Sequence, residues 1–212
     1  MAGIPIVCSP PNMAPYGAKD EGVHNSPIAI AVPTKRHRSV VLDMATSLAA
    51  GGKLTLAAGK GVPLGEGWAL SGDGNPTTDP NLAKILVPSG GPKGSGLAFM
   101  FQCLTSLMAG NPLLAPVLRG GENPRTQNSV VAAIDIGVFT DVVAYGENVD
   151  ALTDCLKTLP TSAGFGEIFV PGQPEDRTCD DRAQNGIPLP PGTVHKLRGS
   201  VERFGIDLPE GV

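Results

Sequence analysis

The stretch NSVVAAIDIGVFTDVV, residues 128–143, decides the class of fold. Its first half is a continuous run of β-branched and small apolar residues, which is typical of a strand buried in a sheet. In a doubly wound parallel sheet, such a strand is separated from the next strand along the sequence by one helix, which gives a βαβ unit. This run has no neighbour at that spacing. The chain is therefore expected to form an α/β or α+β fold whose sheet is not a simple doubly wound one.

Four further apolar runs predict the partner strands of this sheet. They are IPIVCS (4–9), IAIAVP (28–33), SVVLDM (39–44) and EIFVP (167–171). Several of them are too continuously apolar to face water on either side. The sequence thus predicts a central sheet that is covered on both faces.

Helical periodicity predicts the elements that cover the sheet. The periodic runs lie at 44–54, 96–110, 148–159 and 192–206. In the second run, Leu97, Phe101, Leu104 and Met108 form one stripe that should pack on an apolar surface. Residues 59–84 are rich in Gly, Pro, Asp and Asn and show no period, so we expect a long loop there.

Composition bounds the class of protein. A chain of 212 residues can bury the core of one domain, and its 41% hydrophobic and 17% charged residues argue against disorder. The net charge of −4 comes without a basic stripe, so no nucleic-acid partner is expected. No apolar run reaches membrane-spanning length, so no membrane partner is expected either.

The four cysteines point to a compartment. Cys8, Cys103, Cys155 and Cys179 show no CxxC spacing, and three of them lie in apolar or amphipathic runs. Buried free thiols in a reducing compartment are the simplest interpretation, which predicts a cytoplasmic protein.

Standard cofactor and metal motifs are absent from the sequence. A P-loop needs Gly before its Lys and Ser or Thr after it, whereas Lys93 lies between Pro92 and Gly94. No GxGxxG follows a strand and opens a helix, and no HExxH occurs. The histidines, His24, His37 and His195, are far apart, so we predict no metal site.

Two segments remain as candidates on physical grounds. In GGPKGSG (90–96), glycines allow close approach of the backbone to a ligand, and Lys93 adds positive charge near a helix N-terminus. The alternative is an ordinary Gly-rich turn with a solvent-facing lysine. Asp43, Thr46 and Ser47 gather a carboxylate and two hydroxyls where a strand meets a helix, although Asp43 would also serve as the N-cap of that helix.

Taken together, six ordered segments resemble one family. They are MAPYG (13–17), NSPIAIAVPT (25–34), VVLDMATS (40–47), GWALSGDGNPTTDP (67–80), GGPKGSGLA (90–98) and NGIPLPP (185–191). They resemble the malate/L-lactate dehydrogenase family, which includes ureidoglycolate dehydrogenase, 2,3-diketo-L-gulonate reductase, sulfolactate dehydrogenase and Δ1-piperideine-2-carboxylate reductase.

The resemblance carries expectations about fold and activity. It implies a sulfolactate-dehydrogenase-like, non-Rossmann fold with a large mixed, mostly antiparallel sheet covered by helices. It also implies a homodimer that uses NAD or NADP to interconvert a 2-hydroxy acid, of the malate, lactate or ureidoglycolate type, and its 2-oxo acid. Residues 1–212 would be the cofactor-binding and core portion, and residues from about 165 to 212 a C-terminal helical segment packed on it.

The resemblance also implies which residues form the site. Met13 would lie near the substrate. The cofactor contacts would be Ser9, Asp43, Met44, Ala45, Thr46, Ser47, Pro92, Lys93, Gly172, Gln173 and Pro174.

One departure from the family concerns the N-terminus. The family carries a helical N-terminal part with the catalytic histidine, and nothing here matches it, so no catalytic residue is expected in this chain. We expect either a truncated chain or a separate polypeptide that supplies that part. Two alternatives stay open: a reductase of cyclic imines (piperideine- or pyrroline-2-carboxylate), and a non-catalytic remnant that keeps the fold.

Overall fold

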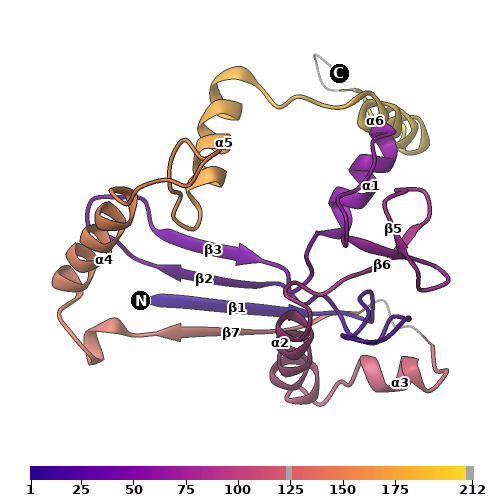
Figure 1. Ribbon diagram of the computed structural model, residues 1–212, viewed down its shortest axis with the longest axis horizontal. Helices are drawn as coiled ribbons and strands as arrows, with labels where there is room; N and C mark the ends of the chain where they lie inside the picture. Colours follow the sequence, from indigo (N-terminus) through magenta and orange to yellow (C-terminus); the bar gives the residue numbers. More distant parts are fainter. Residues whose placement is uncertain (123–125, 209–212) are drawn as a thin grey trace.

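A four-stranded antiparallel sheet forms the centre of the computed structural model, which describes residues 1–122 and 126–208 (Figure 1). Its strands, in spatial order, are β3 (Val40–Met44), β2 (Ile28–Val32), β1 (Ala2–Cys8) and β7 (Asn128–Ile134). Every neighbouring pair runs antiparallel, and β1 pairs with β7 along its whole length. The prediction of a mostly antiparallel, non-Rossmann sheet is therefore confirmed.

One face of this sheet carries the helix α2 (Pro92–Gln102) and its continuation η1, a π-helical turn at Cys103–Leu107. Ile6 and Cys8 on this face are buried. On the opposite face Val131 of β7 is 75% exposed, and a side chain at Gly3 would meet nothing. The expectation that both faces are covered is thus wrong at this edge of the sheet within the described ranges.

Helix α2 also packs differently from the predicted stripe. Phe101 is buried, but Leu97, Leu104 and Met108 are exposed. The buried face instead carries small and polar residues, namely Gly94, Ala98, Gln102, Thr105 and Ser106. Small side chains let the helix approach the sheet closely, an option that hydrophobic periodicity does not reveal.

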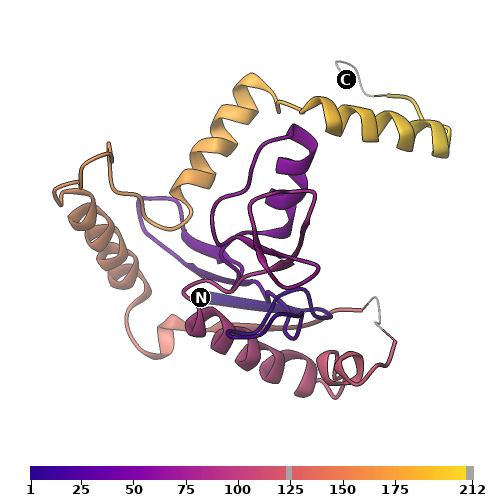
Figure 2. The same cartoon turned by 45° about the vertical axis from the view of Figure 1, so that its right-hand side comes forward.

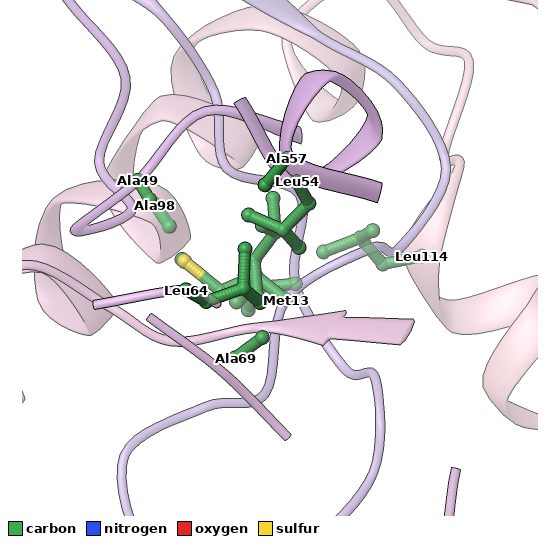
Figure 3. Packing of buried hydrophobic residues seen from close by; sticks show 10 residues of the cluster. Met13, Ala49, Leu54, Ala57, Leu64, Ala69, Ala98 and Leu114 are labelled. Carbon is green, nitrogen blue, oxygen red and sulfur yellow. The ribbon is translucent and has the colours of Figure 1, made fainter. Parts of the chain in front are cut away.

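A second, three-stranded sheet lies in the segment predicted as a loop. It is formed by β5 (Pro76–Thr77), β4 (Ala69–Ser71) and β6 (Ala83–Leu86), in that spatial order. Strands of two to four residues are too short to leave a recognisable period, which is why the loop prediction was wrong here. Met13, Leu54, Leu64 and Ala69 form a core cluster beside this sheet (Figure 3).

The helix predicted to begin at residue 44 begins later. Met44 ends β3, and α1 spans Gly51–Lys60 with Ala50 as its N-cap. The intervening residues bond to other segments, since the Thr46 N–H donates to Asn25 O (2.8 Å). Asp43 is therefore not an N-cap, and this carboxylate lies exposed in β3.

The remaining helices lie at the periphery of the molecule, and the C-terminal helix lies beyond α1 and not on the central sheet (Figure 2). They are α3 (Leu114–Leu118), the 3-10 turn η2 (Ile136–Val138), α4 (Val142–Lys157), α5 (Gln173–Asn185) and α6 (Pro191–Phe204). α6 contacts α1. None of the helices in the described ranges combines the length and apolar character that a bilayer crossing requires.

The strand predicted at 167–171 is not formed. The segment runs beside β3 and accepts one backbone hydrogen bond from it, from the Val41 N–H to Pro171 O (3.3 Å). Because proline has no N–H, the segment cannot return a bond at this residue, and a ladder does not develop.

The cysteines are free, as predicted, but not uniformly buried. Cys8 is buried and Cys103 is partly buried, whereas Cys155 and Cys179 are exposed. The prediction of burial is wrong for the last two, because α4 and α5 turn those faces to solvent.

The turn between β2 and β3 is tied to α4 and α5. The buried Asp150 of α4 accepts hydrogen bonds from the N–H groups of Arg36 (2.8 Å) and His37 (3.2 Å). Arg38 forms ion pairs with Asp176 (3.4 Å) and Asp180 (2.8 Å) of α5. Exposed ion pairs contribute little one by one, but together these contacts hold the first turn of α5 beside β3.

Candidate functional site

The antiparallel order brings the ends of several strands to one end of the sheet. β1 ends at Cys8 and β3 ends at Met44, whereas β2, which lies between them, begins at Ile28. Ser9 and Met44 therefore lie at the same end, although 35 positions separate them in the sequence. Ser9 is half-buried there and Met44 is exposed.

A pocket of about 540 Å³ forms where the first turn of α5 meets β3. Asp43, Gly172 and Pro174, three of the predicted cofactor contacts, line it together with Val41 and Phe169. Gly172 has φ 87°, and a Cβ there would lie 3.0 Å from Val41 O. Only glycine combines this left-handed backbone with such a close approach to β3.

Gln173 lies half-buried at the start of α5. Its Oε1 accepts hydrogen bonds from Lys157 Nζ (2.9 Å) and from the Val170 N–H (3.4 Å). This side chain fixes the turn that presents Gly172 and Pro174 to the pocket.

Thr46 and Ser47 lie three and four residues beyond Asp43, against the segment that precedes α2. The Ser89 N–H donates to Thr46 O (2.9 Å), and Ser47 pairs with Pro88 as an isolated β-bridge. Three residues of chain span at most about 10 Å, so this region adjoins the pocket at Asp43.

The hydroxyl of Thr46 is an unusual group in this region. Thr46 is fully buried, and its Oγ1 has no hydrogen-bond partner among residues 1–122 and 126–208. Buried polar atoms are nearly always paired, but Thr46 is fully buried and offers no surface of its side chain to a bound molecule.

Lys93 lies exposed at the surface, directly after the two glycines and the proline of the Gly-rich loop. Gly90 and Gly91 both have φ 59°, and α2 begins at Pro92, which is exposed like Lys93. The first amides of α2 are already engaged, since the Gly94 N–H donates to Ser89 O (2.8 Å) and the Ser95 N–H to Gly91 O (3.2 Å). Attraction of an anion would therefore depend more on the Lys93 side chain than on the helix terminus.

Met13 occupies a different environment from the other predicted residues. Its side chain is fully buried in the core cluster, and its backbone bridges to Val23 and to Leu86 (Figure 3). The structure therefore offers a substrate no surface of this side chain.

The sequence model of the family described as malate/L-lactate dehydrogenase matches residues 1–198. The chain belongs to this family. The prediction made from the six ordered segments is thereby confirmed. Members of the malate/L-lactate dehydrogenase family also share its fold: malate dehydrogenase from Pyrococcus horikoshii superposes with a TM-score of 0.81 at 27% identity, over 98% of this chain and 59% of that chain.

Two curated members of the malate/L-lactate dehydrogenase family are similar in sequence. L-sulfolactate dehydrogenase from Methanocaldococcus jannaschii is 33% identical over 99% of this chain and 61% of its own length. (2R)-3-sulfolactate dehydrogenase (NADP(+)) from Chromohalobacter salexigens is 33% identical over 90% of this chain and 56% of its own length. The chain thus spans about three fifths of the length of the relatives it matches.

The candidate residues taken from the family resemblance remain predictions, and the residues that support them in the structure were not predicted. Asp43 lines the pocket beside β3, whereas Thr46 and Ser47 contact the segment that leads into the Gly-rich loop. The pocket-lining Val41 and Phe169 were not singled out, because an apolar residue in a strand-like run carries no functional signal. Within the described ranges no three His, Cys, Asp or Glu side chains gather as a metal site.

His24 lies next to the site and gives a prediction about pH. Its Nδ1 accepts the Ser26 N–H (3.1 Å), which leaves the proton of the neutral ring on Nε2. Burial lowers the pKa of His24 from 6.5 to about 4, so the folded state disfavours the charged ring. As pH falls below 6.5, the unfolded chain takes up a proton that the folded chain refuses, and stability is lost progressively down to about pH 4.

We expect the free energy of unfolding to fall by about 1–2 kcal/mol between pH 7 and pH 5 through His24, allowing for its partly solvated ring. Urea denaturation at several pH values gives the free energy of unfolding of the native chain and of His24→Gln. Subtracting one pH dependence from the other removes the contribution of the carboxylates, which both proteins share. His195→Gln, on the exposed face of α6, is the control. If the free energy of unfolding depends on pH in the same way for the native chain and His24→Gln, the prediction is contradicted.

Proposed function

We propose that this chain is the cofactor-binding portion of an NAD(P)-dependent oxidoreductase that interconverts a 2-hydroxy acid and its 2-oxo acid by hydride transfer. The observation that carries the proposal is that Asp43 and Gly172 line one pocket, while Thr46, three residues beyond Asp43, bonds to the segment that leads into the Lys93 loop. Membership of the malate/L-lactate dehydrogenase family supports it. The activity of the whole enzyme is part of the proposal, because the chain spans only about three fifths of its relatives.

The chemistry of the residues suits a dinucleotide. Lys93 supplies an exposed positive charge for a phosphate. Asp43 and Glu175 line the pocket beside Gly172. Carboxylates accept hydrogen bonds from ribose hydroxyls and repel phosphate, so they suit the sugar better than the diphosphate.

A bound nicotinamide cofactor would supply the hydride acceptor or donor, and oxidation of the substrate hydroxyl would also need a proton acceptor. We propose Ser9 for the nicotinamide end and the region of Met13 for the substrate end, in line with the family. His24 is engaged at Nδ1, and His37 pairs with Asp154 (2.9 Å) far along the sheet. We therefore assign the acceptor to neither.

We further propose that the protein works in the cytoplasm as a homodimer on a small 2-hydroxy or 2-oxo acid. The free thiols are consistent with a reducing compartment. Whether a separate chain supplies a further part of the enzyme is tested by the same activity assay that tests the function.

Direct titration tests the proposal. We expect NADH, NADPH or both to bind the folded chain with a measurable heat in isothermal titration, whereas ATP, which lacks nicotinamide, should bind more weakly. A folded sample that binds neither dinucleotide would refute the proposal. Assays with malate, lactate, ureidoglycolate and a cyclic imine carboxylate then separate a dehydrogenase from an imine reductase, and turnover of any of them excludes the non-catalytic remnant.

A further inference from the structure

Two asparagines outside the predicted site form a closed pair of hydrogen bonds. Asn12 Nδ2 donates to Asn25 Oδ1 (3.0 Å), and the Asn25 N–H donates to Asn12 Oδ1 (2.8 Å). Asn25 Nδ2 also donates to Ser47 Oγ (3.3 Å), and Ser47 Oγ donates onward to Ala49 O (2.8 Å). We call Asn12 and Asn25 the asparagine clasp.

Backbone bonds extend the clasp toward the Gly-rich loop. The Thr46 N–H donates to Asn25 O (2.8 Å), and Thr46 O accepts from the Ser89 N–H (2.9 Å). Ser89 O in turn accepts from the Gly94 N–H (2.8 Å) at the start of α2. A continuous series of hydrogen bonds therefore links the clasp to Thr46 and from there to the turn that carries Lys93.

We propose that Asn12 and Asn25 are positioning residues of the dinucleotide site: their paired amides fix Thr46 and Ser47, and through them the Gly-rich loop. The inference rests on the proposed function. Each amide side chain supplies both the acceptor and the donor that these bonds require. Removing one amide leaves partly buried partners unsatisfied, which releases the segment at 46–47.

A second asparagine pair provides a matched control. Asn111 Nδ2 donates to Asn128 Oδ1 (3.0 Å), and Asn128 Nδ2 donates to Asn111 O (2.9 Å). This pair has the same chemistry, but it is more exposed and joins the segment after η1 to β7. Asn111→Ala therefore removes an equivalent interaction without touching the series that leads to Lys93.

The test combines a measurement that needs no ligand with one that does. Amide hydrogen exchange is followed by mass spectrometry in peptides covering residues 44–50 and 86–92, for the native chain, Asn25→Ala and Asn111→Ala. NADH and NADPH affinities are measured on the same samples, together with their thermal midpoints. We expect Asn25→Ala to speed exchange in both peptides and to weaken dinucleotide binding by about 10-fold or more. Asn111→Ala should do neither.

The outcomes separate the inference from the proposed function. Unchanged exchange in both peptides of Asn25→Ala, or an affinity loss no greater than in Asn111→Ala, would overturn the inference. If the native chain binds neither dinucleotide, the proposed function fails, and the positioning role fails with it even where exchange shows that the clasp orders the loop. If Asn25→Ala does not fold, Asn12→Ala, which leaves the bond from Asn25 to Ser47 in place, is judged by the same two measurements.

Discussion

Gly94→Ala should destabilise the protein by about 3 kcal/mol, the upper end of the range for inserting an atom into a well-packed site. Gly94 is buried at the point where α2 crosses Thr46. A Cβ there would collide with the carbonyl oxygen of Thr46 and would lie 2.6 Å from Ser89 O. Both atoms belong to backbone, so the clash cannot be relieved by turning a side chain. In a chain of this size the thermal midpoint should fall by roughly 6–12 °C.

Gly96→Ala is the matched control for this variant. It lies in the same helix two residues later, where a Cβ would meet nothing within 4 Å. Because alanine favours helices, this change should stabilise the protein by about 0.5–1 kcal/mol. Thermal or urea unfolding of both variants provides the comparison, and equal midpoints would mean that α2 does not meet Thr46 as described.

Lys93→Ala should weaken dinucleotide affinity by about 1.5–3 kcal/mol, the usual value of a hydrogen bond to a charged group, or roughly 10- to 150-fold in Kd. Lys93 is exposed at the start of α2 and carries the positive charge of the Gly-rich loop. Its removal should leave the thermal midpoint of the unliganded chain almost unchanged, because the side chain supports little of the fold.

Isothermal titration at two salt concentrations checks the prediction for Lys93. At high salt, charge screening should reduce the difference in dinucleotide affinity between the native chain and Lys93→Ala. Lys53→Ala, at an exposed position of α1, serves as the control and should bind like the native chain. An affinity that is equal in Lys93→Ala and Lys53→Ala would return Lys93 to the role of a solvent-facing lysine in a turn.

Much of the central sheet could be predicted from local pattern. The runs that became β1, β2, β3 and β7 are short, apolar and bounded by turn residues. The missing βαβ neighbour of residues 128–134 excluded a doubly wound sheet. The helix near residue 96 and the one near residue 148 were also recognisable, although both begin earlier in the structure than the periodicity indicates.

Elements whose structure depends on distant partners were not predictable in this way. Thr46 follows a helix-like pattern, yet its backbone N–H bonds to Asn25, 21 positions back, and its C=O bonds to Ser89, 43 positions ahead. Helix α5 is almost entirely polar, so no apolar period marks it. Ion pairs with Arg38 hold it in place instead. The site residues themselves came from the ordered family motifs, since glycines and hydroxyls alone carry no specific signal.

The single bond from Val41 to Pro171 has a consequence for solubility. β3 is an edge strand, and unpaired backbone groups along such an edge can recruit strands from other molecules and start aggregation. Pro171 and Gly172 shield part of this edge without becoming a strand that would itself offer a new edge. At the part of the edge that they leave open, the exposed charge of Asp43 disfavours pairing with another strand. A pocket thus remains open beside β3, whereas pairing of this edge with a strand of another molecule is disfavoured.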